Sequence, residues 1–203
     1  MKNIYLIGDS LRFGAPNLSG YNFISPGYEK YVREKLAGVA NVLGPPENCR
    51  FAQYTLRFLS SWTRNIPASQ IDVVHWNNGA WDALRMFDDD PLTPIDVYAQ
   101  MLKRIYKRIR LLMPNAKVVF ALTTPMIEAK QDPNFFRKNS EIQEYNRVAC
   151  EVMKELGVPV NDLYTFVSGF DDSYFVDYAH LSEKGCSVVA DEVAEVCLKL
   201  LEK

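Results

Sequence analysis

The sequence contains few of the residues from which metal and redox sites are built. It has two histidines, His75 and His180, and its four cysteines show no CxxC spacing. Cys49 lies outside the predicted helices, whereas three cysteines fall in helical patterns beside apolar neighbours: Cys150, Cys186 and Cys197. We therefore expect free, mostly buried thiols in a cytoplasmic protein, without disulfide, metal or cofactor.

Long apolar runs and a strong charge bias are also absent. No stretch reaches the roughly 20 apolar residues that span a bilayer, and the N-terminus enters a strand pattern without a signal-peptide pattern. The net charge of −2 favours neither nucleic acid nor a membrane as a partner. Basic residues on the helix predicted over residues 95–113 are interpreted as a solvated face rather than a polyanion site.

Without a repeat, low-complexity tract or flexible linker, the 203 residues are predicted to form one domain. Apolar runs predict strands over residues 3–7, 39–43, 71–77, 116–122 and 158–160. Three-to-four spacing predicts helices over residues 28–38, 52–66, 95–113, 136 or 140 to 156, and 182–201. The remaining segments are predicted to be loops: residues 11–26, 81–94, 126–138 and 162–180, the last of them with one short helix.

This alternation of strands and helices predicts an α/β fold of three layers. Short strands joined by long crossovers require a parallel sheet with helices on both faces. We expect five parallel strands in the flavodoxin-like order 2-1-3-4-5.

Ser10 follows the first predicted strand, after Gly8 and Asp9. It would lie at the carboxyl end of that strand, where open α/β sheets place their sites. The next helix N-terminus would offer backbone N–H groups to a developing negative charge. Gly-Asp-Ser is also an ordinary turn or N-cap sequence, so Ser10 is a candidate nucleophile only together with a base.

His180 is the candidate base. It lies in the loop before the last helix, three residues after Asp177. The carboxylate can then orient one ring nitrogen while the other faces a serine. The competing interpretation is a pair of surface residues before a helix N-cap. His75 lies inside the third predicted strand and is interpreted as a core or rim histidine.

Asn77 and Asn78 leave the carboxyl end of the third predicted strand, on the same rim as Ser10. An amide held about 3 Å from a developing oxyanion would stabilise it, although Asn78-Gly79 is also a common turn pair. A serine, an Asp-His pair and an amide at neighbouring sheet ends together predict a serine hydrolase.

The sequence resembles the SGNH, or GDSL-type, hydrolase superfamily from residue 8 to residue 180. Gly8-Asp9-Ser10 matches its nucleophile motif, and Asp177-x-x-His180 matches its last motif. Residues 76–79 read Trp-Asn-Asn-Gly where the family usually has Gly-x-Asn-Asp. Asn78 then corresponds to the oxyanion-hole Asn and Gly79 replaces Asp; a shift of one residue would select Asn77.

The second motif departs from the family pattern. The family has an Asn followed five residues later by a Gly whose N–H donates to the oxyanion. Here Asn48 is followed by Gln53, which can still donate through its backbone unless a positive φ or close substrate contact demands Gly. The resemblance implies an oxyanion hole made by the N–H groups of Ser10 and Gln53 and the Asn78 side chain.

The resemblance also implies two-step acyl transfer without metal or cofactor, in which Ser10 attacks an ester, His180 takes its proton and Asp177 stabilises the imidazolium. We expect a short-chain ester of a small molecule or a carbohydrate, such as an O-acetyl sugar, because aromatic residues in or next to the predicted loops could stack on a sugar or line a short acyl pocket; the alternative is that they only cover the end of the sheet. These aromatic residues are Tyr21, Phe23, Tyr28, Trp81, Phe87, Phe135, Phe136, Tyr174 and Tyr178. The alternatives are a non-enzymatic flavodoxin-like domain that binds an anion or another ligand, and a catalytically impaired relative. No particular oligomeric state is predicted.

Overall fold

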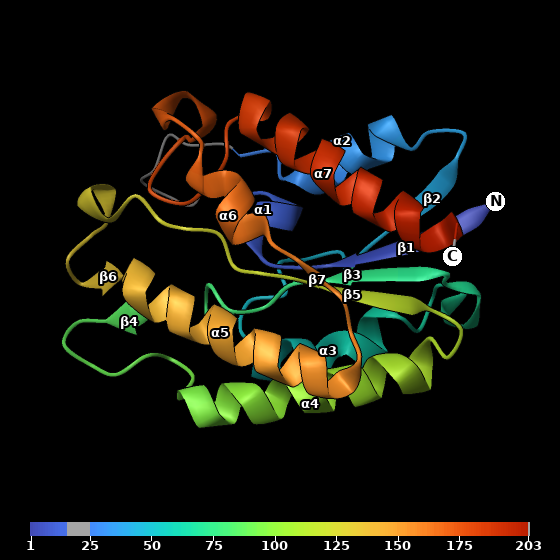
Figure 1. Cartoon of the computed structure of the whole chain (residues 1–203), viewed down its shortest axis with the longest axis horizontal. Helices are drawn as coiled ribbons and strands as arrows, with labels where there is room; N and C mark the ends of the chain where they lie inside the picture. The colour runs from blue at the N-terminus through green and yellow to red at the C-terminus, as the bar shows by residue number, and fades with distance from the viewer. Residues whose placement is uncertain (16–24, 203) are drawn as a thin grey trace.

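The computed structural model describes residues 1–15 and 25–202, and it confirms the predicted parallel sheet (Figure 1). The five strands are β1 (Lys2–Ile7), β2 (Ala40–Leu43), β3 (Val73–Trp76), β5 (Lys117–Ala121) and β7 (Val160–Asn161). They are arranged as β2-β1-β3-β5-β7, which is the predicted order 2-1-3-4-5 counted along the chain. The register pairs Ile7 with Trp76 and Trp76 with Phe120, so the carboxyl ends of the three central strands lie side by side.

Helices cover both faces of the sheet, which gives the predicted three layers (Figure 1). One face carries α1 (Ser10–Phe13), α2 (Tyr28–Lys35), α6 (Leu163–Ser168) and α7 (Glu183–Glu202). The other face carries α3 (Ala52–Trp62), α4 (Ile95–Leu112) and α5 (Asn139–Leu156). The helices bury their apolar faces against the strands. This burial produces the three-to-four spacing of apolar residues from which the long helices were predicted.

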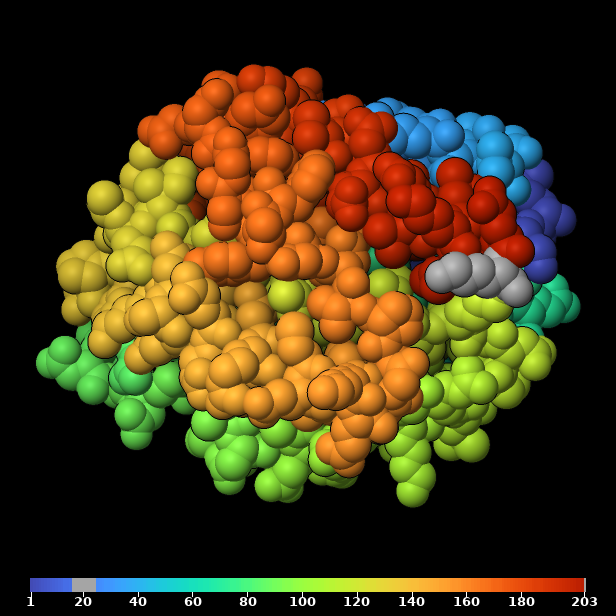
Figure 2. Space-filling model, in the orientation of Figure 1, coloured from blue at the N-terminus to red at the C-terminus, as the bar shows by residue number. Residues whose placement is uncertain are grey.

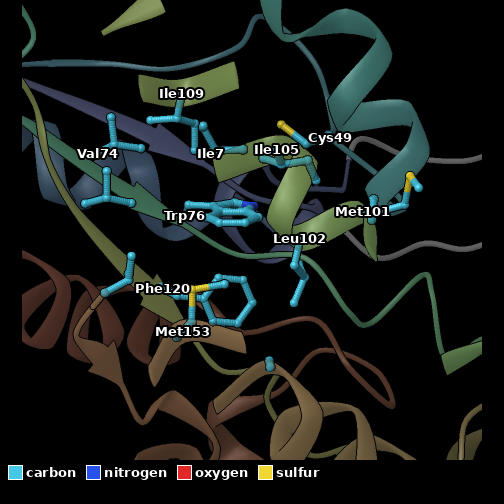
Figure 3. Packing of buried hydrophobic residues seen from close by; sticks show 14 of the residues in the cluster. Ile7, Cys49, Val74, Trp76, Met101, Leu102, Ile105, Ile109, Phe120 and Met153 are labelled. Carbon is cyan, nitrogen blue, oxygen red and sulfur yellow. The ribbon is translucent and has the colours of Figure 1, made fainter. Parts of the chain in front are cut away.

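The core beneath α3, α4 and α5 is built around Trp76 and Phe120 (Figure 3). The two rings pack edge to face, with centroids 4.9 Å apart. Ile105 and Ile109 of α4 are fully buried in the same cluster. Burial of such side chains stabilises the fold by about 1.5–3 kcal/mol each.

One pair of strands is absent from the sequence-based prediction. Residues 81–94 and 126–138, predicted to be loops, contain β4 (Arg85–Met86) and β6 (Phe135–Phe136), which pair antiparallel. Strands of two residues are too short to show alternation, so periodicity gave no signal for them. Arg85 ties the pair to α5 through an ion pair with Glu141 at 2.8 Å.

Several predicted boundaries are also corrected. Helix α3 ends at Trp62 rather than residue 66, where Thr63 Oγ1 donates to the Leu59 carbonyl at 2.9 Å and the chain continues in turns. The loop predicted over residues 11–26 begins with the short helix α1, and residues 16–24 of it lie outside the described residues.

All four cysteines are free, and three are buried. Cys49 lies in the core under α3 to α5, whereas Cys186 and Cys197 lie in the core under α2 and α7. Burial raises the pKa of Cys49 and Cys186 to about 11 and that of Cys197 to about 12. Cys150 is half-buried. Across residues 1–15 and 25–202, no helix has the length and apolar character that crossing a bilayer requires.

Candidate active site

Ser10, His180 and Asp177 lie together beyond the carboxyl end of β1. Ser10 Oγ lies 2.8 Å from His180 Nε2, and His180 Nδ1 lies 2.6 Å from Asp177 Oδ2. The fold thus joins the first residue of α1 to the loop between α6 and α7. The side chains of His180 and Asp177 are 18% and 17% exposed, so the pair is reachable from solvent but mostly shielded.

Asp9 sets the turn that presents Ser10. Its Oδ1 accepts the N–H of Leu11 at 3.0 Å, and its carbonyl accepts the N–H of Phe13, also at 3.0 Å. In the first turn of a helix the N–H groups have no intrahelical acceptor, and that of Ser10 has no partner among the described residues. Asp9 is buried, which raises its pKa.

The protonation of the Asp177–His180 pair follows from its hydrogen bonds. Asp177 Oδ1 accepts the N–H groups of Ala179 and His180, both at 2.7 Å. Burial opposes ionisation of Asp177, but these bonds and the His180 ring outweigh it, and the pKa of Asp177 is lowered. An ionised carboxylate can only accept, so His180 Nδ1 carries the proton and Nε2 accepts from Ser10 Oγ. This is the tautomer that a general base requires.

The loop that carries Asp177 and His180 is fastened to the segment after β5. The N–H of Ile127 donates to the carbonyl of Tyr178 at 2.8 Å, and Lys130 pairs with Asp172 at 2.8 Å. In the space-filling view the orange loop region lies directly against this yellow segment (Figure 2). These contacts orient His180 although no long helix or strand carries it.

A pocket with a volume of about 440 Å³ opens beside Ser10 and His180. This volume suits a small molecule. Three of the predicted aromatic residues line it, namely Trp81, Phe135 and Tyr178, and Phe13 was not predicted. Phe87 is instead 70% exposed, and Tyr28 is buried in the core. Tyr21 and Phe23 lie outside the described residues.

Asn78 does not line the pocket but is fully buried behind it. Its Oδ1 accepts from Trp76 Nε1 at 2.8 Å, and its Nδ2 donates to Arg50 O and Thr55 Oγ1, both at 3.0 Å. Because an indole N–H can only donate, the orientation of the amide is fixed, and both of its N–H bonds are occupied. Asn77 Nδ2 donates to Ala121 O at 2.9 Å.

Gln53 also lies off the pocket wall, and its Oε1 accepts from Thr93 Oγ1 at 3.1 Å. The nearby pocket residues are Asn48 and Arg50, which form a tight turn. Arg50 has a φ of 51°, and its N–H donates to Asn48 Oδ1 at 2.8 Å. Asn78 holds the other side of this turn through the Arg50 carbonyl.

Gly79 has a structural reason to replace the usual Asp of the motif. Its φ is 148°, and a Cβ atom at this position would collide with Thr123 Oγ1. Only glycine combines that backbone conformation with so close an approach.

Arg137 and Asp82 lie in or near the pocket and were not predicted from the sequence. Arg137 lines the pocket and donates from Nε to the carbonyl of Ala80. Asp82 accepts the N–H of Ala52, the first residue of α3, at 3.0 Å, and burial raises its pKa to about 7. Both lie in segments without periodicity, so no sequence signal singled them out.

His75 is fully buried inside β3, as predicted. Its Nε2 lies 3.4 Å from Asn161 Nδ2, and burial lowers its pKa to about 4, so the ring is neutral near pH 7. Within residues 1–15 and 25–202, no group of three or more His, Cys, Asp or Glu side chains is arranged to hold a metal ion.

Relatives of known name share parts of the sequence. Over 116 residues the chain is 29% identical to GDSL esterase/lipase CPRD49 of Arabidopsis thaliana, covering 52% of this chain and 45% of that protein. Over 102 residues it is 30% identical to isoamyl acetate-hydrolyzing esterase 1 homolog of Homo sapiens, covering 45% and 41%. The matched part spans less than half the length of these curated relatives.

Solved structures resemble the whole chain. The lipase/acylhydrolase from Enterococcus faecalis aligns with a TM-score of 0.75 and 21% identity, covering 97% of this chain and 95% of that one. The acetyl xylan esterase AlAXEase aligns with a TM-score of 0.71 and 15% identity, covering 96% and 98%. At these identities the likeness concerns the fold. A model of the GDSL-like lipase/acylhydrolase family matches residues 6–188, and the chain therefore belongs to that family.

Proposed function

We propose that this protein is a serine esterase that cleaves short-chain acyl esters. The observation that carries the proposal is the hydrogen-bond chain from Ser10 through His180 to Asp177 at the edge of the pocket. Family membership and the esterase names of the relatives support ester chemistry. A binding domain without chemistry would give His180 no reason to lie 2.8 Å from Ser10, so the enzyme is favoured.

The reaction follows from these positions. Ser10 Oγ attacks the ester carbonyl while His180 Nε2 takes its proton, and Asp177 stabilises the resulting imidazolium. The tetrahedral intermediate collapses and expels the alcohol, which receives the proton from His180. Water then attacks the acyl-serine with His180 again as base, which releases the acid and restores Ser10.

The oxyanion needs donors that are free when it forms. The N–H of Ser10 is the first such donor, because it has no partner among the described residues. The N–H of Gln53 is the second candidate. Asn78 qualifies only if its amide releases Arg50 O or Thr55 Oγ1 when substrate binds.

The acyl portion is proposed to be short, with O-acetyl groups on carbohydrate as one substrate class. A volume of about 440 Å³ holds a small ester, and Trp81 and Tyr178 offer faces on which a sugar ring can stack. The names of the human relative and of AlAXEase, which mention acetate and acetyl xylan, agree with this choice.

Substitution of the nucleophile tests the proposal. Ser10→Ala should lower kcat for 4-nitrophenyl acetate by more than about 1,000-fold, because no other hydroxyl replaces the attacking oxygen. A fluorophosphonate probe should label wild-type protein at Ser10 and leave the variant unlabelled.

Ser61→Ala, on the exposed face of α3, serves as the matched control and should react like the wild type. Wild-type-like turnover by a folded Ser10→Ala protein would refute the nucleophile. Folded wild-type protein that neither turns over esters nor takes up the probe would refute the esterase.

A further inference from the structure

Arg137 is a buried cation in the pocket that the proposed mechanism does not use. It follows β6 directly, lines the same pocket as Ser10 and His180, and is 5% exposed. No Asp or Glu oxygen of the described residues lies within 4.0 Å of its guanidinium. Residues 16–24, which lie outside the described part, contain no acidic residue in the sequence.

Arg12 shows how this fold treats a buried arginine that has a structural role. It is 1% exposed and pairs with Glu29. Its guanidinium also donates to the carbonyls of Gly8, Pro45 and Glu47. Arg137 has one backbone acceptor, Ala80 O, at its Nε. Most of the N–H groups of the Arg137 guanidinium can therefore donate to another partner.

The surroundings of Arg137 do not neutralise it by contact. Burial lowers the pKa of Arg137, and this is opposed first by Tyr178, a side-chain hydrogen-bond partner on the pocket wall, and then by the charges of Asp9 and Asp177, which form no ion pair with it. Asp177 is already paired with His180, and burial disfavours the ionised form of Asp9. A buried guanidinium without a paired anion is costly, so a ligand that supplies one would bind here with a large advantage.

We propose that Arg137 is a specificity-determining residue that binds a carboxylate of the substrate, so that the preferred substrates are small esters that also carry a carboxylate. This inference rests on the proposed esterase function. The planar fork of an arginine matches the two oxygens of a carboxylate, and such charge-assisted pairs are stronger than neutral hydrogen bonds. Because Arg137 shares one pocket with Ser10, the carboxylate and the scissile ester lie in the same small molecule.

Two pairs of matched esters test the inference and identify the side that carries the charge. For the acyl side, mono-4-nitrophenyl succinate is compared with 4-nitrophenyl butyrate. For the alcohol side, 4-acetoxybenzoate is compared with 4-acetoxybenzamide. In at least one pair the acid should have a kcat/KM about 10- to 100-fold above its neutral partner, mainly through a lower KM.

Substitutions then assign the preference to Arg137. Arg137→Gln should abolish it while leaving turnover of the neutral esters within about threefold, a split that a general structural defect would not produce. Arg137→Lys keeps the charge without the fork and should retain part of the preference, which covers the case in which the Gln variant does not fold. Arg57→Gln removes an exposed charge on α3 and should change neither rate.

Direct binding separates this inference from the esterase proposal. Benzoate should change the intrinsic tryptophan fluorescence of the wild type, because Trp81 lines the pocket. It should not change the fluorescence of the Arg137→Gln variant. Hydrolysis of neutral esters without acid preference or benzoate binding would overturn the role of Arg137 alone. Benzoate binding that depends on Arg137, without hydrolysis of any ester, would overturn the esterase alone.

Discussion

At the scale of single residues, Asn78 links the rim of β3 to the turn at Arg50. Its amide makes three hydrogen bonds: it accepts one from Trp76 and donates one each to Arg50 and Thr55. Asn78→Ala would leave the buried Trp76 indole N–H without its acceptor and would remove the hydrogen bonds to the Arg50 carbonyl and to Thr55 Oγ1, which still donates to the Cys49 carbonyl. It should therefore lower the free energy of unfolding by about 2–4 kcal/mol, measured by urea denaturation.

Asn77→Ala provides the comparison, because Asn77 donates a single bond to Ala121 O. Its loss should cost about 1 kcal/mol. If Asn78→Ala is as stable as the wild type yet loses about 100- to 1,000-fold in kcat, Asn78 acts as an oxyanion donor rather than as a support for the turn.

Residue types and spacing were enough to predict that Ser10, Asp177 and His180 meet. The order of the strands brings the end of β1 to the loop before the last helix, and only one histidine lies outside a strand. The surroundings of Asn78 were not predictable, because which partners an amide finds depends on how the loops pack. Arg137 gave no signal for the same reason.

At the scale of the element, α3 depends on an acid from another loop. Its N-cap, Phe51, has no side-chain acceptor, and Asp82 supplies one by accepting the N–H of Ala52 at 3.0 Å. Burial raises the pKa of Asp82 to about 7, above its ordinary value near 4. The folded state therefore binds this proton more tightly than the unfolded chain, and stability falls as pH rises from about 4 to 7.

Asp82→Asn should remove this dependence while keeping an acceptor for Ala52. Relative to the variant, the wild type should lose about 2–3 kcal/mol of unfolding free energy between pH 5 and pH 8. Denaturant titrations at the two pH values measure the difference. Asp96→Asn, an exposed acid in the first turn of α4, should show no such change, and parallel pH curves for wild type and Asp82→Asn would contradict the assignment.

The long helices and the parallel strands were predictable because burial imposes a period on their sequences. The pair β4–β6 was not, since each strand has two residues and is held by its position between loops and α5. That pair nevertheless places Phe135 in the pocket, with Arg137 following directly after β6. The elements with the weakest sequence signal thus carry part of the pocket wall.

At the scale of the whole molecule, the site follows from the winding of the sheet. The connection after β1 runs over one face through α1 and α2, whereas the connection after β2 crosses the other face through α3. A crevice opens between β1 and β3 where the direction of winding reverses. The position of the site therefore follows from the order of the strands, which was predictable from the sequence, and does not depend on particular side chains.

The three buried thiols lie in the two cores on opposite faces of the sheet, so the rate at which each is alkylated measures how often the protein opens on that face. Iodoacetamide should alkylate half-buried Cys150 first, while Cys49, Cys186 and Cys197 react only during opening, at least about 1,000-fold more slowly than in urea-unfolded chain. Peptide mass spectrometry would give the alkylation rate of each cysteine. The rate of Cys49 reports opening of the α3–α5 layer, and the rates of Cys186 and Cys197 report opening of the α2–α7 layer. Equal rates for both layers would indicate one cooperative unit, and rates as fast as that of Cys150 would contradict their burial.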